Sequence, residues 1–148
     1  MKIPVATILA LKKSQVFSID AGAPVIDAVK EMNRHQIGSL IILKEGKLVG
    51  IFTERDVLQR VVVPGLSAES TLVSEVMSKD VDTFSPLMLV DEALAHMNKN
   101  RHRHVPVVSG EEILGLLSIG DITRWLGKNY ENEAQSLMNY FTGTYDEF

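Results

Sequence analysis

Two stretches of the sequence share one pattern of residues that are able to do chemistry. Residues 50–56 and 115–121 each contain a glycine, two apolar residues, a hydroxyl residue, two variable residues and an aspartate. At the start of a helix, this spacing forms a capping box between the hydroxyl residue and the aspartate. The same groups suit a nucleotide, because the hydroxyl donates to phosphate and the carboxylate accepts two hydrogen bonds from a ribose diol. The groups concerned are Thr53 with Asp56, and Ser118 with Asp121.

A basic segment precedes the second motif. Residues 96–104 contain one lysine, two arginines, three histidines and no acid, and Arg55 lies inside the first motif. Three interpretations stay open for this segment: a solvated loop, a metal site using His102 and His104, and a phosphate site. Two imidazoles without an acid or cysteine at ligand spacing are too few for a metal, so we predict none. The phosphate site is favoured, because arginine binds phosphate oxygens bidentately.

The composition excludes several classes of protein. Fifteen lysines and arginines against nineteen acids leave a net charge of −4, which argues against nucleic acid as a partner. The chain has no cysteine, so disulfides, thiolate catalysis and cysteine-ligated zinc are excluded. No apolar run approaches the roughly 18 residues of a membrane span, and the N-terminus lacks a signal-peptide pattern. We therefore expect a cytoplasmic protein with no membrane partner.

The elements that position these motifs are duplicated. When the chain is shifted by 65 positions, seven of the 42 residue pairs between 16–57 and 81–122 are identical. Each copy contains a short extended piece (15–19 and 81–84), an amphipathic helix, two strands joined by a polar turn, and a second helix. A single copy would expose much of its sheet. The predicted fold class is therefore α/β (α+β), with two β-α-β-β-α repeats packed sheet to sheet in pseudo-two-fold symmetry.

The expected organisation follows the duplication. The first repeat covers residues 4–63, a linker covers 64–71, and the second repeat covers 72–127. Residues 128–148 form a C-terminal helix and tail, in which Ala134, Leu137, Met138 and Phe141 follow helical spacing. This last helix is interpreted either as a simple surface helix or as a segment that covers the domain or docks a second subunit.

The sequence resembles a tandem pair of CBS (cystathionine beta-synthase) domains, also called a Bateman module, of the stand-alone bacterial type. The marks are the two Gly-apolar-apolar-[Ser/Thr]-x-x-Asp endings and the segment Arg103-His104-Val105-Pro106-Val107, and the resemblance covers residues 4–127. It implies a cleft between the repeats that holds up to two adenosine-type ligands. It also implies a homodimer.

The resemblance also implies roles for individual residues. The aspartates would hold the riboses, the hydroxyl residues of the motifs and three basic side chains would contact phosphate, and the strand starts would meet adenine. Copy one has Gly38 and Ser39 where copy two has Arg103 and His104, so the two pockets are expected to differ in affinity. The expected nucleotide-binding residues are Ser18, Ile37, Gly38, Ser39, Thr53, Arg55, Asp56, Thr83, Arg103, His104, Val105, Ser118 and Asp121.

We interpret the chain as a regulatory module that is not an enzyme, with no catalytic residues and no catalytic cofactor. It would bind an adenine nucleotide, with AMP or NAD ranked before ATP, and would signal to an unknown protein partner in trans. One alternative is an enzyme that acts on a nucleotide, although the sequence shows no P-loop and no readable triad. Another is an RNA or protein interaction module that uses the basic segment.

Overall fold

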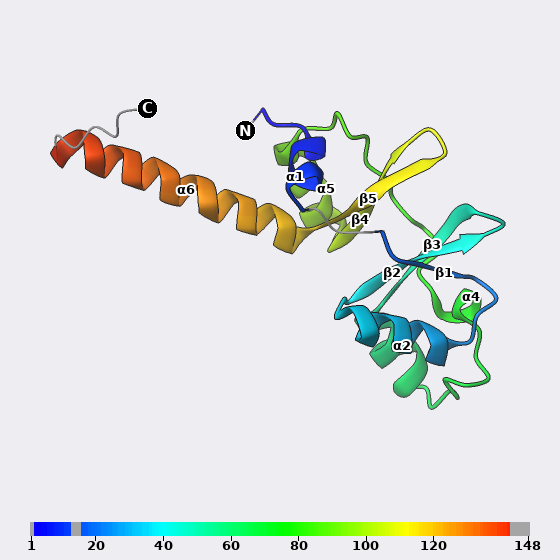
Figure 1. Cartoon of the computed structure of the whole chain (residues 1–148). Coiled ribbons are helices and arrows are strands. Elements are labelled where there is room, and N and C mark those ends of the chain that lie inside the picture. Colours follow the sequence, from blue (N-terminus) through cyan, green and yellow to red (C-terminus); the bar gives the residue numbers. More distant parts are fainter. Residues whose placement is uncertain (1, 13–15, 143–148) are drawn as a thin grey trace.

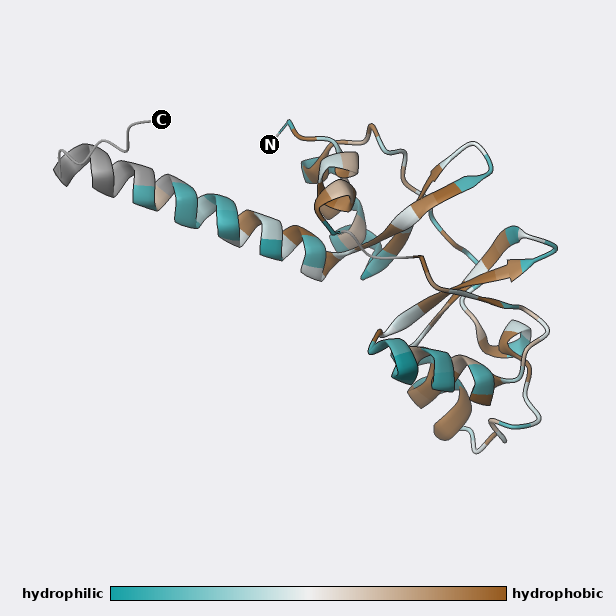
Figure 2. Cartoon of the chain, viewed as in Figure 1, coloured by the Kyte–Doolittle hydropathy of each residue, from teal (hydrophilic) through white to brown (hydrophobic). Residues whose placement is uncertain are grey.

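The computed structural model describes residues 2–12 and 16–142 and consists of two similar α+β halves. In the first half, β1 (Ser18–Asp20), β2 (Ser39–Lys44) and β3 (Lys47–Thr53) form one sheet in that order. Strand β1 runs parallel to β2, and β2 runs antiparallel to β3. The strands are hydrophobic and the loops at the hairpin tips are hydrophilic (Figure 2). This pattern places the hairpin loops in solvent and the buried residues of β2 and β3 in the interior.

The second half repeats the hairpin. Strands β4 (His104–Ser109) and β5 (Glu112–Ser118) pair antiparallel, as β2 and β3 do. Both hairpins carry a register shift at the same place, after Ile42 in one and after Val107 in the other, which lie 65 positions apart. The extended piece predicted at 81–84 does not form a full strand. Within 81–84, only Phe84 makes a bridge, parallel to Val107, so this sheet has two strands among the described residues.

The amphipathic helices lie where the apolar spacing predicts them. Helix α2 (Val25–His35) buries Val25, Ala28 and Met32, and helix α5 (Val90–Asn100) buries Val90, Ala93 and Met97. Both helices end in a left-handed residue, Gln36 in α2 and Arg101 in α5, whose φ angles are 53° and 56°. These two positions are again 65 apart. The matching caps turn each helix toward the start of the next strand.

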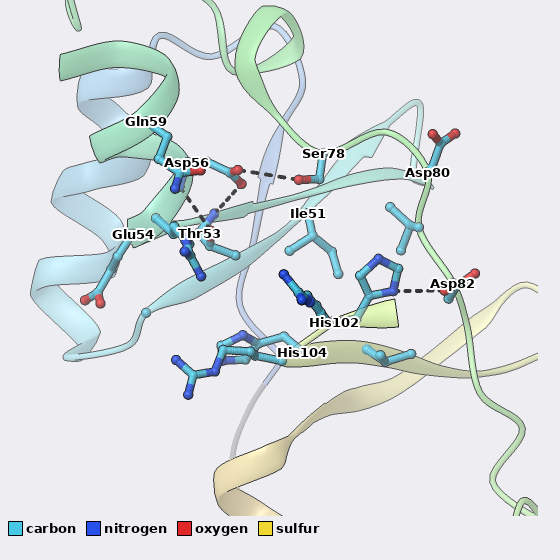
Figure 3. A pocket seen from close by; sticks show the side chains of 16 residues that line it. Ile51, Thr53, Glu54, Asp56, Gln59, Ser78, Asp80, Asp82, His102 and His104 are labelled. Atoms are coloured by element: carbon cyan, nitrogen blue, oxygen red, sulfur yellow. Dashed lines mark hydrogen bonds and ion pairs between the residues drawn. The ribbon is translucent and has the colours of Figure 1, made fainter. Parts of the chain in front are cut away.

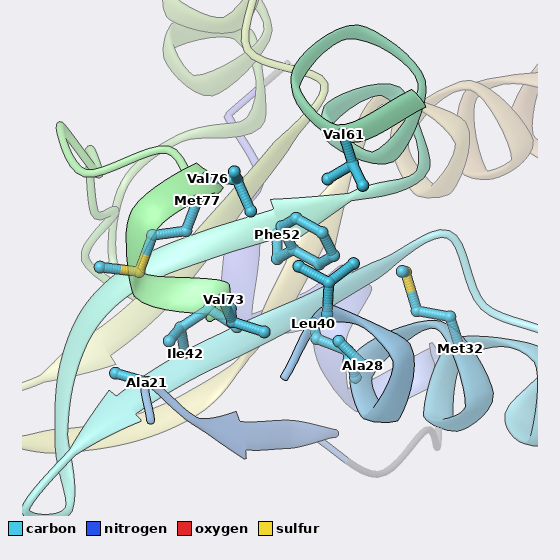
Figure 4. Close-up of a cluster of buried hydrophobic side chains, with 11 residues drawn as sticks. Ala21, Ala28, Met32, Leu40, Ile42, Phe52, Val61, Val73, Val76 and Met77 are labelled. Atoms are coloured by element: carbon cyan, nitrogen blue, oxygen red, sulfur yellow. The ribbon is translucent and has the colours of Figure 1, made fainter. Parts of the chain in front are cut away.

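The two cores exchange their covering segments. Helix α4 (Val73–Val76) follows the first repeat in the chain and packs on its core, where Figure 4 shows Val73 and Val76 beside Leu40, Ile42 and Phe52. Helix α1 (Val5–Lys12) lies inside the residues expected for the first repeat but packs on the second core. The backbone confirms this exchange, since Val5 donates to the carbonyl of Met88 at 2.8 Å. The packing therefore crosses the repeat boundaries expected at 4–63 and 72–127.

The last helix of each half begins at the hydroxyl residue of the motif. In the first half, α3 (Glu54–Asp56) continues into η1 (Val57–Val62), a π-helical segment in which Val63 donates to the carbonyl of Leu58. In the second half, α6 (Ile119–Thr142) runs without a break past Gly127 and projects away from both cores (Figure 1). The expected terminal helix is thus the continuation of the last helix of the repeat. The side chains of Leu137, Met138 and Phe141, like residues 13–15, lie outside the described part. Among the described residues, no helix combines the length and apolarity needed to cross a bilayer.

Candidate functional site

Two clefts combine residues of both repeats. The first, of about 330 Å³, brings Thr53 and Asp56 together with residues 101–105 of the second half. The second, of about 360 Å³, brings Ser118 and Asp121 together with residues 36–39 of the first half. We call them the Asp56 cleft and the Asp121 cleft. Both volumes lie within the range of small-molecule sites.

In the Asp56 cleft, the aspartate closes a capping box. The backbone of Thr53 donates to Oδ2 of Asp56 at 3.0 Å, and the backbone of Asp56 donates to the Thr53 hydroxyl at 3.2 Å. The other carboxylate oxygen, Oδ1, has weaker neighbours: the Ser78 hydroxyl at 3.5 Å and Nε of Arg60 at 3.6 Å. Figure 3 shows Asp56 and Ser78 on one side of the cleft, opposite His102 and His104.

The basic segment forms the facing wall of the Asp56 cleft. Arg101, His102, Arg103 and His104 all line it. Nδ1 of His102 lies 2.9 Å from a carboxylate oxygen of Asp82, an acid that sequence spacing did not associate with this histidine. Three further carboxylates, Glu54, Asp56 and Asp80, line the same cleft. Four acids and three arginines therefore line this cleft.

The Asp121 cleft has the same capping box with stronger partners. The Ser118 backbone donates to Oδ2 of Asp121 at 2.9 Å, and the Asp121 backbone donates to the Ser118 hydroxyl at 3.0 Å. Nζ of Lys12 lies 2.9 Å from Oδ2, and a guanidinium nitrogen of Arg124 lies 2.6 Å from Oδ1. Burial works to raise the pKa of Asp121, but the hydrogen bonds from Lys12 and Ser118 outweigh it and hold the pKa below its usual range.

His104 faces both clefts. Burial lowers the pKa of this imidazole below its ordinary value of 6.5, and the positive charges of Lys12 and Arg103 lower it further. The ring is therefore neutral near pH 7. A neutral imidazole contributes a hydrogen bond to a ligand instead of a charge, so His104 adds no positive charge to either cleft.

The structure brings most of the predicted site residues together. The Asp56 cleft is lined by seven of them: Gly38, Thr53, Arg55, Asp56, Arg103, His104 and Val105. The Asp121 cleft is lined by Ile37, Ser39, Ser118 and Asp121, shares His104, and shares Gly38 with the first cleft. Ser18 and Thr83 are exposed and line neither cleft, whereas their neighbours Phe17 and Asp82 do.

Several cleft residues escaped sequence reasoning. Lys12 and Arg124 bind Asp121, and Ser78, Asp80 and Asp82 line the Asp56 cleft. Lys12 and Asp121 are more than a hundred positions apart and meet only because α1 crosses to the second core. Of these residues, only Arg124 could have been predicted from local spacing, because it lies one helical turn after Asp121. Among the described residues, no group of three or more histidine, cysteine, aspartate or glutamate side chains is arranged to hold a metal ion.

Comparison with known protein families finds the same domain twice in this chain. The profile of the CBS domain matches residues 8–63 and matches again at 73–128. The chain belongs to the CBS domain family. The two halves are thus a tandem CBS pair, as the resemblance predicted, and each cleft lies between the two CBS domains.

Relatives and solved structures agree with this assignment. The CBS pair is 39% identical over 126 residues to CBS domain-containing protein CBSX3, mitochondrial, of Arabidopsis thaliana, covering 82% of this chain and 61% of that one. The chain thus spans about three fifths of that relative. It is 33% identical to the solved CBS domain NE2398, with a TM-score of 0.78 and coverage of 84% and 97%. It is 27% identical to the CBS domain pair of protein MJ0100, solved in complex with 5′-methylthioadenosine and S-adenosyl-L-methionine (TM-score 0.76, coverage 87% and 99%).

Proposed function

We propose that this CBS pair is a regulatory module that binds an adenine nucleotide in each of its two clefts. The observation that carries the proposal is the composition of each cleft: a buried aspartate from one repeat faces the strand start of the other. The carboxylate accepts from the ribose diol, the facing backbone meets the base edge, and the arginines meet phosphate.

The capping role of the aspartates is compatible with ribose binding. Each capping box uses one oxygen of the carboxylate for the backbone of the hydroxyl residue. A carboxylate has about four acceptor positions, so acceptor capacity remains toward the cleft. The bound adenosine derivatives of the related pair from protein MJ0100 support adenosine as the shared part of the ligand. The arginines on the wall of the Asp56 cleft support a ligand that carries phosphate, and we rank AMP and NAD first.

A ligand held between two repeats is well placed to regulate. Because each cleft takes residues from both CBS domains, an occupied cleft favours one relative arrangement of the domains over others. A protein partner that binds this arrangement more tightly is then controlled by ligand concentration, and the coupling is reciprocal. The module acts in this proposal by binding alone, as a homodimer that signals in trans without chemical turnover.

Calorimetric titration with AMP, NAD and ATP tests the proposal. Saturable binding of at least one of them is expected, and no heat of binding at millimolar concentration of all three would contradict it. Asp56→Asn and Asp121→Asn should each weaken one site by about tenfold or more, because a charge-assisted hydrogen bond to the diol is lost. Asparagine retains an oxygen for the capping box, so the fold is preserved.

Asp27→Asn is the matched control for these variants. Asp27 is exposed on α2 and lines neither cleft, so the same loss of charge should leave both affinities unchanged. Thermal unfolding of each variant checks that the fold is intact. Chromatography of the nucleotide after incubation separates the regulatory module from an enzyme, since conversion of AMP, NAD or ATP into a product would contradict binding alone.

A further inference from the structure

The two clefts differ in how their aspartates are partnered. We propose that the Asp121 cleft binds only adenine ligands that carry phosphate, whereas the Asp56 cleft also binds the bare nucleoside, and that Arg124 sets this difference. The inference rests on the proposed function and adds a specificity rule to each site. It follows from the acceptor positions of the two carboxylates and from the pseudo-symmetric residues around them.

The carboxylate of Asp121 is nearly saturated. Its Oδ2 accepts from the Ser118 backbone at 2.9 Å and lies 2.9 Å from Nζ of Lys12, while its Oδ1 accepts from Arg124 at 2.6 Å. Of about four acceptor positions on a carboxylate, one remains. A ribose diol donates two hydrogen bonds, so a ligand can use both hydroxyls only when one of the two cations moves away.

Arg124 is the cation that moves. Its side chain is 71% exposed, whereas that of Lys12 is 28% exposed and also donates to the carbonyl of Leu116 at 2.8 Å. Release of the guanidinium costs its charge-assisted bond to Asp121. A phosphate on the ligand offers the guanidinium a new anionic partner in the same cleft, and a nucleoside offers none. Asp121 is the one acid that lines this cleft among the described residues, so the compensation has to come from the ligand.

The Asp56 cleft needs no such exchange. Oδ2 of Asp56 accepts from the Thr53 backbone, and Oδ1 has only the Ser78 hydroxyl at 3.5 Å and Arg60 at 3.6 Å. The position equivalent to Arg124, 65 residues earlier, is Gln59, which lines this cleft and is neutral. The diol therefore finds free acceptors whether or not the ligand carries phosphate.

Reciprocal exchange of the two equivalent residues tests the inference. Titrations of adenosine and of AMP are followed by calorimetry on the full chain. The wild type should bind one adenosine but two AMP per chain, with the adenosine site weakened by Asp56→Asn and unaffected by Asp121→Asn. Arg124→Gln should add a second adenosine site. Gln59→Arg should weaken adenosine binding in the Asp56 cleft by about tenfold while AMP binding is retained.

Lys128→Gln is the matched control for Arg124→Gln. Lys128 lies one turn further along α6 and does not line the Asp121 cleft, so this variant should still bind a single adenosine. A second adenosine site in Lys128→Gln would assign the effect to general charge and overturn the role of Arg124. Two adenosine sites in the wild type, or one in Arg124→Gln, would overturn the inference while the proposed function stands. Absence of any binding, of AMP included, would instead overturn the proposed function itself.

Discussion

The exchange of covering segments makes one sharp prediction at a pair of equivalent glycines. Gly50 and Gly115 lie 65 positions apart on β3 and β5, and each faces the segment that covers its core. A Cβ at Gly50 would lie 2.5 Å from Sδ of Met77 and 2.9 Å from the carbonyl oxygen of Ser78. A Cβ at Gly115 would meet only the side chain of Leu9, at 3.0 Å.

The size of each destabilisation depends on whether the atoms next to the added Cβ can move. Ser78 is held by two backbone hydrogen bonds with Ile51, at 2.9 and 3.0 Å, so its carbonyl moves only if the bridge breaks. Gly50→Ala should therefore cost about 2 kcal/mol, within the usual range for overpacking. For a chain of this length, that lowers the melting temperature by roughly 4–8 °C. Leu9 is able to rotate, so Gly115→Ala should cost less than about 1 kcal/mol.

Urea and thermal unfolding of the two variants measure the difference directly. Both substitutions restrict the unfolded chain equally, so that contribution cancels between them. Displacement of Ser78 should also weaken ligand binding in the Asp56 cleft and leave the Asp121 cleft unaffected. Equal destabilisation by the two substitutions, or a Gly50→Ala variant as stable as the wild type, would refute the packing of α4 on the first core.

Three further predictions concern stability. Ser118→Ala removes the hydroxyl of the second capping box and should lower the free energy of unfolding by about 1 kcal/mol, as measured by urea titration. Phe52→Ala, in a fully buried position, should cost about 3–5 kcal/mol, and an unchanged thermal midpoint would contradict the assigned core. Because the pKa of His104 is lowered from 6.5 by burial, the unfolded chain binds more protons just below that pH, so stability should decline as pH falls through this window. His104→Gln should reduce that decline when unfolding is compared at about pH 7.5 and 5.5.

Sequence reasoning succeeded where the pattern is local. The stripe of Val90, Ala93 and Met97 predicted a buried helix face, and the polar residues between two apolar runs predicted each hairpin. The comparison of the chain with itself at an offset of 65 extended this local information to the whole fold. The two Thr/Ser-x-x-Asp motifs both form capping boxes and both line a cleft.

The sequence was silent where distant contacts decide the outcome. The position of α1 depends on the hydrogen bond from Val5 to Met88, which no local pattern predicts. The weak first strand of the second repeat depends on how much of 81–84 pairs with β4, and only Phe84 does. Lys12 reaches Asp121 as a consequence of the first of these contacts, so neighbouring residues in the sequence could not predict that Lys12 lines the second cleft.

The crossed placement of α1 and α4 has a mechanical consequence. A cut in the segment between the repeats would leave a first fragment without α4 and a second fragment without α1. Each fragment would then expose part of its hydrophobic core to solvent. The two halves are consequently expected to melt together in a single transition. If one half rotates relative to the other, α1 has to move with the second half and α4 with the first, because each helix packs on that core. The path of the chain thus couples the two halves, because each core is covered by a helix from the other repeat.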